Sequence, residues 1–90
     1  MNPESTNGKV SDNQALILAP LEGKFYLTRE PNQKAIMIGD QVEKGQTIGY
    51  IESMKVLNAI SADQAGKVVE IIPNIGENIE EDDPLVMLSV

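Results

Sequence analysis

Two places in this 90-residue chain carry side chains whose type and spacing could do chemistry. One is Lys55, which Met54 precedes and Val56 follows in a short segment between two apolar runs. A lysine at the apex of a tight turn exposes its amine to acylation, and the methionine offers a soft apolar contact to a partner protein. The other place is a run of carboxylates near the C-terminus. We expect the chemistry to centre on the lysine.

The acidic run could suggest a cation site, but its spacing fits no calcium loop. We interpret it as a solvated turn and predict no metal site. Glu22 and Glu52 could be taken for a catalytic pair, yet the sequence does not bring them together, so we place each on a β surface. The run has five carboxylates in seven residues: Glu77, Glu80, Glu81, Asp82 and Asp83.

The composition excludes several classes of protein. The chain has neither His nor Cys, which removes disulfides, thiolate nucleophiles, Ser-His and Cys-His dyads and nearly every zinc or haem site. Its net charge of -7 opposes binding to nucleic acid or anionic membranes. No apolar run approaches the roughly 18 residues that span a bilayer, and the start lacks the pattern of a secretory signal. We expect a soluble, intracellular protein that is not an enzyme by itself.

The chain length allows one domain, and the pattern from residue 15 onward is all-β. Short apolar runs alternate there with Gly, Pro, Asn and Asp, and no 3.6-residue period is sustained. Residues 1–14 are polar, and we interpret them as a flexible leader or linker stub before a domain at 15–90. The predicted strands are Ala15–Ala19, Gly23–Leu27, Gln41–Val42, Gln46–Glu52, Val56–Ser61, Lys67–Ile72, Asn78–Ile79 and Leu85–Ser89.

An internal repeat divides the domain into two similar halves. Residues 38–43 recur thirty-seven positions later as residues 75–80, whereas Gly23 matches Gly66 at an offset of forty-three. The first half therefore carries six extra residues, and they fall within the polar segment Thr28–Ala35. We predict a pseudo-twofold with this segment as an insertion outside the repeat.

The pseudo-twofold predicts a tight hairpin with Met54 and Lys55 at its tip, opposite the chain ends. Two-residue hairpin turns usually contain Gly or Asn, because the favoured turns need positive φ. This tip contains neither. Such a departure from turn chemistry marks a candidate functional site, since something other than the turn selected the residues.

The segment Glu52-Ser53-Met54-Lys55-Val56 resembles the biotin-attachment motif Glu-Ala-Met-Lys-Met of biotin carboxyl carrier proteins. Ser53 replaces the usual Ala and Val56 the second Met, and we expect both changes to be tolerated. The inserted segment after Phe25-Tyr26 is similar to the "thumb" of the acetyl-CoA carboxylase branch. Further matching segments are residues 19–26, 42–48, 65–68 and 83–86.

The resemblance implies a flattened β sandwich, a barrel-sandwich hybrid of two four-stranded antiparallel sheets. It implies that biotin protein ligase reads Met54 and Val56 and attaches biotin covalently to Lys55. The domain would then carry carboxybiotin between biotin carboxylase and carboxyltransferase, for malonyl-CoA and fatty acid synthesis. The thumb would comprise Thr28, Arg29, Glu30, Pro31, Asn32, Gln33, Lys34 and Ala35.

Two alternatives stay open. The domain could serve another biotin-dependent carboxylase or decarboxylase, such as one acting on pyruvate or propionyl-CoA, although the thumb-like insertion opposes this. It could instead be an unmodified biotinyl-like regulatory module, although such a module would need neither Lys55 nor Met54. The resemblance predicts a cytoplasmic protein, or a plastid one if a transit peptide is missing from the sequence.

Overall fold

A computed structural model describes residues 13–90 of the chain, and their regular structure consists of eight β-strands. All eight predicted strands are present, with ends that differ from the prediction by at most one residue. Within these residues there is no helix with the length and apolarity needed to cross a bilayer. The strands are β1 (Gln14–Leu18), β2 (Gly23–Tyr26), β3 (Gln41–Val42), β4 (Thr47–Ser53), β5 (Val56–Ser61), β6 (Gly66–Ile71), β7 (Asn78–Ile79) and β8 (Pro84–Ser89).

The predicted leader, residues 1–14, lies outside the described residues except for its last two. Gln14 is already the first residue of β1, where it pairs with Ser89 of β8. The first strand therefore begins one residue earlier than the change in hydropathy indicates, because a ladder partner can hold a polar residue in a strand.

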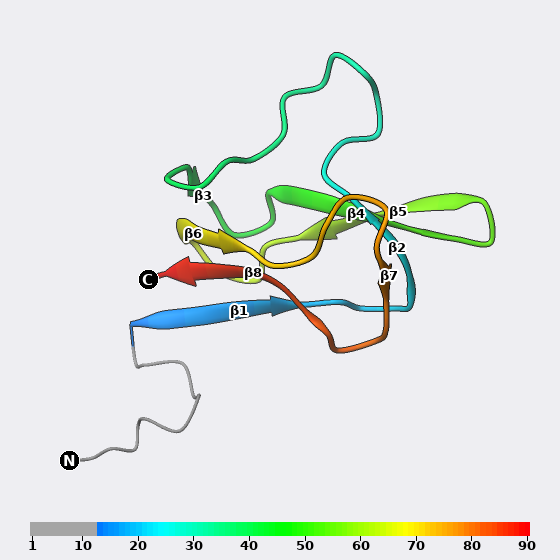
Figure 1. Cartoon of the computed structure of the whole chain (residues 1–90). Helices are drawn as coiled ribbons and strands as arrows, with labels where there is room; N and C mark the ends of the chain where they lie inside the picture. Colours follow the sequence, from blue (N-terminus) through cyan, green and yellow to red (C-terminus); the bar gives the residue numbers. More distant parts are fainter. Residues whose placement is uncertain (1–12) are drawn as a thin grey trace.

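The strands form two four-stranded antiparallel sheets, in the orders β1-β8-β6-β3 and β5-β4-β2-β7. This confirms the predicted flattened sandwich. The pseudo-twofold converts one sheet into the other, since β1, β8, β6 and β3 match β5, β4, β2 and β7. Figure 1 shows the C-terminus at one end of the molecule and the β4–β5 hairpin projecting at the other.

Aliphatic side chains fill the space between the sheets. Phe25 is the one aromatic residue in the main cluster of buried side chains within residues 13–90, and Tyr50 is buried as well. Fully burying such a side chain stabilises the fold by roughly 1.5–3 kcal/mol. The largest fully buried side chains are Phe25, Ile48, Ile51, Leu85, Leu88, Val42, Val68 and Val86.

Hydrogen bonds exchanged between the two halves support the pseudo-twofold directly. The Gly39 N–H donates to the Val68 carbonyl at 2.7 Å, and its equivalent, the Gly76 N–H, donates to the Phe25 carbonyl at 2.7 Å. Both glycines have positive φ, 99° and 84° respectively. Equivalent glycines in the two halves thus donate equivalent hydrogen bonds to a strand of the opposite half, which confirms the repeat.

Candidate functional site

The β4–β5 hairpin places Met54 and Lys55 at its tip, as predicted. Ser53 pairs with Val56, so Met54 and Lys55 alone form the turn. Their φ angles are 53° and 66°, the left-handed conformation of a type I′ turn. Residues with a Cβ adopt it at a cost of roughly 1–2 kcal/mol each. The fold therefore tolerates strain at the point where Lys55 is presented.

The three residues at the tip are open to solvent. Met54 is 93% exposed and Val56 57% exposed, although both are apolar. Lys55 is also exposed, and in the described part of the chain its ammonium makes no hydrogen bond or ion pair. Its amine is therefore free to react, and the flanking apolar side chains are free to contact another protein.

Asn58 holds the hairpin together behind its tip. Its side-chain Nδ2 donates to the carbonyls of Ile51 and Val56, both at 3.2 Å. Sequence reasoning missed this residue. The repeat contained a signal, because the position that matches Asn58 in the first half is Ala15, which cannot make such bonds.

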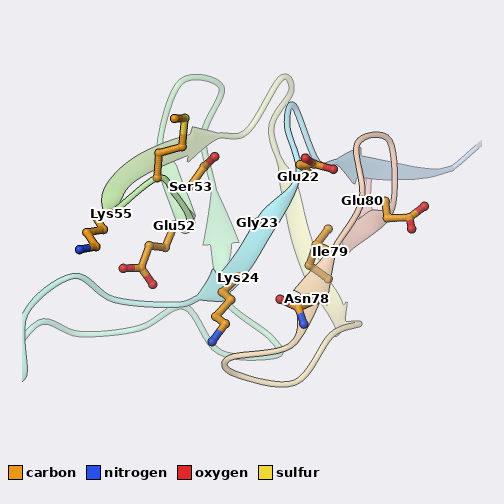
Figure 2. A pocket seen from close by; sticks show the side chains of 10 residues that line it. Glu22, Gly23, Lys24, Glu52, Ser53, Lys55, Asn78, Ile79 and Glu80 are labelled. Atoms are coloured by element: carbon orange, nitrogen blue, oxygen red, sulfur yellow. The ribbon is translucent and has the colours of Figure 1, made fainter.

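An open groove lies beside Lys55 on the outer surface of the β5-β4-β2-β7 sheet. Its volume is about 640 Å³, and Glu22, Lys24, Glu52 and Glu80 are among its charged lining residues. Lys24 and Glu52 are register partners on adjacent strands. Figure 2 shows Lys55, Glu52 and Lys24 in succession along the same side of the sheet. The structure thus brings Glu22 and Glu52 to one groove, a proximity that the sequence did not reveal.

The other half of the molecule lacks two of these carboxylates. The positions equivalent to Glu22 and Glu52 are Ala65 and Ser89. Because the equivalent strands pair in the same order in the other sheet, folding alone does not require an acid at either position. We therefore associate these acids with the side of the molecule that presents Lys55.

The segment Thr28–Ala35 forms an irregular loop that projects from the sandwich (Figure 1). It is closed internally by a hydrogen bond from the Gln33 N–H to the Glu30 carbonyl, 3.1 Å long. The next residue, Ile36, is 9% exposed and belongs to the core. The insertion is therefore a surface loop whose C-terminal base is anchored in the core.

Tyr50 ties this loop to β4. The Gln33 Nε2 donates to the Tyr50 hydroxyl at 3.0 Å, and the Arg29 N–H donates to the Gln33 Oε1 at 2.8 Å. The Arg29 guanidinium carbon also lies 6.0 Å from the centroid of the Tyr50 ring. Tyr50 is only 6% exposed, whereas its repeat equivalent Met87 is partly exposed.

The acidic run takes part in a turn. The Glu80 N–H donates to the Asp83 Oδ2 at 2.9 Å, and Asp82 has a φ of 73°. Its repeat equivalent Gly45 has a φ of 88°, so the two halves share this turn. Among residues 13–90, no cluster of three or more His, Cys, Asp or Glu side chains is arranged to hold a metal ion.

Two antiparallel sheets that present an exposed lysine on a strained hairpin form a small domain able to display a covalently attached group. The profile of the family described as "Biotin-requiring enzyme" matches residues 15–88, and the chain belongs to that family.

Named relatives come from bacteria and plants. The chain is 37% identical over 82 residues to the biotin carboxyl carrier protein of acetyl-CoA carboxylase from Nostoc sp., covering 89% of this chain and 45% of the relative. It is 38% identical over 71 residues to the chloroplastic protein of the same name from Glycine max, covering 78% of this chain and 27% of the relative. The chain thus spans less than half of either relative.

A solved structure with a similar fold is the urea carboxylase of Kluyveromyces lactis. It superposes with a TM-score of 0.73 at 26% sequence identity, covering 89% of this chain and 6% of that much longer one.

Proposed function

We propose that the chain is the biotinyl domain of a biotin carboxyl carrier subunit of acetyl-CoA carboxylase, with biotin attached covalently to Lys55. The observation that carries the proposal is the hairpin tip, where a free lysine lies between exposed apolar residues. The names of the Nostoc and Glycine max relatives support the choice of enzyme. They also support a location in the cytoplasm or in a plastid.

The residues at the tip fit the prosthetic group. Acylation of Lys55 breaks no hydrogen bond or ion pair, because the ammonium makes none in the described part of the chain. Met54 and Val56 offer apolar surface on either side, which a biotin protein ligase can recognise. Once attached, biotin supplies a ureido nitrogen that accepts and releases a carboxyl group.

The domain contributes transport and leaves catalysis to its partners. The two-residue turn and the Asn58 hydrogen bonds hold Lys55 at a fixed place on the hairpin. Whatever Lys55 carries is confined to the volume that its arm sweeps, which raises its effective concentration at two active sites in turn. Those sites belong to a biotin carboxylase and a carboxyltransferase. The chain itself has no His or Cys for nucleophilic catalysis.

A second candidate is a carrier domain of another carboxylase, which the similarity to the urea carboxylase favours. Reconstitution separates the two. The biotinylated protein is combined with biotin carboxylase and, in parallel reactions, with a carboxyltransferase specific for each acceptor. Carboxylation of acetyl-CoA, propionyl-CoA, pyruvate and urea is then compared.

We expect malonyl-CoA formation from acetyl-CoA to depend on the added domain, with Lys55→Arg giving no product. Turnover of another acceptor instead would assign the chain to that carboxylase. Equal turnover with Lys55→Arg would contradict a carrier role.

A further inference from the structure

A second groove lies between the two sheets, where an edge strand of one meets an edge strand of the other. β1 is at the edge of one sheet and β5 at the edge of the other. The space between them, the edge groove, has a volume of about 430 Å³. One wall consists of β1 and the residues after it, and the other of β5 and the residues after it. The lining residues are Leu16, Ile17, Leu18, Pro20, Ala59, Ile60, Ser61 and Asp63.

The pseudo-twofold axis passes through the edge groove. Each lining residue of one half has its repeat equivalent, forty-three positions away, among the lining residues of the other half. Equivalent residues lie on opposite sides of the axis, so Pro20 and Asp63 mark the two ends of the groove. Each wall extends over roughly 13 Å of chain, which is enough for about four residues of an added strand. The equivalent pairs are Leu16 and Ala59, Ile17 and Ile60, Leu18 and Ser61, and Pro20 and Asp63.

The two walls differ in chemistry although they are built alike. Leu16 and Leu18 stand in β1 where the other half has Ala59 and Ser61. Leu18 is 46% exposed, so much of its side chain is not used by the core. Because the other half forms the equivalent strand with small residues, folding alone does not require a leucine at either position. Apolar side chains two residues apart on an edge strand are suited to contact alternate side chains of an extended peptide.

Neither edge strand carries the charges that usually prevent pairing with another chain. Proteins protect exposed edges with Lys, Pro or irregular register. β1 and β5 contain no charged residue and no Pro. The protection present in β1 is one shift of register, between Ile17 and Leu18. The edge groove thus combines apolar contacts with strand edges that can accept a further strand.

The acidic run lies at one end of the edge groove. The Ala19 N–H donates to the Asp83 carbonyl at 2.8 Å, and the Asp82 N–H donates to the Ala19 carbonyl at 2.8 Å. Ala19 directly precedes Pro20, so the turn that contains the acidic run is attached beside Pro20. This end of the groove is therefore strongly negative.

The opposite end is also negative. The Ala62 N–H donates to the Gln46 carbonyl at 2.8 Å, which places the turn that begins at Glu43 beside Asp63. Lys44 in that turn offsets one of the two negative charges. Within residues 13–90, the carboxylate of Asp63 forms no ion pair. The edge groove is therefore apolar along its middle and acidic at both ends.

We propose that the edge groove is a docking site for an extended segment of a partner protein, with apolar side chains at alternate positions in its middle and Lys or Arg at both ends. The strand edges and the leucines of β1 contact the middle of such a segment. The acidic ends attract its flanking cations. A second copy of this chain fits poorly, because β1 and β5 offer no cation and each copy has a net charge of -7.

Docking at the edge groove leaves the hairpin tip free. Ala59 lies four residues from Lys55 along β5, roughly 13 Å away. A partner segment in the groove can therefore hold the domain in a larger assembly while Lys55 stays accessible. This inference goes beyond the proposed function, since it does not require a group on Lys55.

The test titrates the isotopically labelled protein with a synthetic peptide and follows its amide chemical shifts by nuclear magnetic resonance. In the probe, valine and threonine alternate between two lysines at each end. A control peptide has glutamate in place of every lysine. A further titration adds unlabelled protein, which detects binding of a second copy.

The lysine-flanked peptide should give saturable shifts in residues 16–18 and 59–61. The glutamate-flanked peptide should bind at least about tenfold more weakly, because like charges then meet at both ends. Leu18→Ser introduces the side chain that the other half already has, and it should weaken binding about fivefold through the lost apolar contact. Ile38→Ser is the matched control, since it removes a 66% exposed apolar side chain outside the groove. It should leave the affinity unchanged.

Four results would overturn the inference: no saturable shift, equal binding of the two peptides, equal affinities of Leu18→Ser and Ile38→Ser, or shifts centred on the hairpin tip. Shifts in residues 16–18 on adding unlabelled protein would assign the groove to a second copy and also contradict it. Failure of Lys55 to accept biotin would overturn the proposed function and leave this inference standing.

Discussion

Met54 has a left-handed backbone although it has a Cβ, and nothing in the fold requires methionine at a position that is 93% exposed. Asn tolerates this conformation better. We predict that Met54→Asn raises the free energy of unfolding by about 0.5–1 kcal/mol while slowing biotin transfer by the ligase. Denaturant unfolding and labelling kinetics measure the two effects. A variant that is labelled at the normal rate would remove Met54 from the recognition site.

Asn58 should stabilise the hairpin through its two side-chain hydrogen bonds. Asn58→Asp keeps the size of the side chain and removes both donors, so we predict a loss of about 1–2 kcal/mol in stability. Asn78→Asp is the control, since it adds the same charge to an exposed strand position that makes no side-chain hydrogen bond in the described chain. Equal melting of the two variants would mean that the Asn58 bonds contribute nothing.

For single residues, the sequence predicts the location of Lys55 but not the contacts around it. A turn without Gly or Asn was visible, and the repeat placed it opposite the chain ends. The hydrogen bond between Gln33 and Tyr50 joins residues seventeen positions apart, and no local pattern encodes it. Their pairing depends on the course of an irregular loop, which periodicity does not determine.

Among the elements, the two glycine turns of the repeat should be equally sensitive to substitution. A Cβ at Gly39 or Gly76 would meet no atom within 4 Å, so the cost comes from backbone strain at positive φ alone. We predict that Gly39→Val and Gly76→Val each destabilise the fold by about 1–3 kcal/mol. Ala65→Val, at an exposed position without positive φ, is the control for thermal unfolding. Parent-like melting of both glycine variants would contradict the repeat.

The thumb should become more mobile when its hydrogen bond to Tyr50 of β4 is lost. Tyr50→Phe removes only the hydroxyl that accepts from Gln33, so we predict that the Arg29 amide exchanges about fivefold faster, the equivalent of one hydrogen bond of about 1 kcal/mol. Tyr26→Phe is the matched control, because Tyr26 is the register partner of Tyr50 and its hydroxyl makes no hydrogen bond in the described chain. Unchanged hydrogen exchange in Tyr50→Phe would show that other contacts hold the thumb.

For these elements the sequence predicts strands far better than it predicts turns. Short apolar runs bounded by Gly, Pro, Asn and Asp placed the ends of each strand to within one residue. Asp82 adopts the conformation of Gly45 in the equivalent turn, and an acid at that position concealed the match. The acidic run is interpreted from the sequence as a solvated turn, and in the structure part of it closes a turn through the hydrogen bond from the Glu80 N–H to Asp83.

For the whole molecule, the pseudo-twofold separates residues needed for the fold from residues needed for function. Features present in both halves, such as the glycine turns, build the sandwich. Features without an equivalent in the other copy of the repeat lie on the side of Lys55: Glu22, Glu52, Asn58 and the thumb with Arg29. Their concentration on the side of Lys55 is the main structural argument for the proposed carrier role.

The central claim is that this molecule carries biotin at Lys55 and at no other lysine. The direct measurement incubates the protein with biotin ligase, ATP and biotin, and determines the intact mass and the labelled peptide. The account predicts one biotinyl group on Lys55, and none on Lys55→Arg, whose stability should stay within about 0.5 kcal/mol because the tip is exposed. Labelling of a different lysine, no labelling beside an active ligase control, or acceptance of lipoate in place of biotin would contradict it.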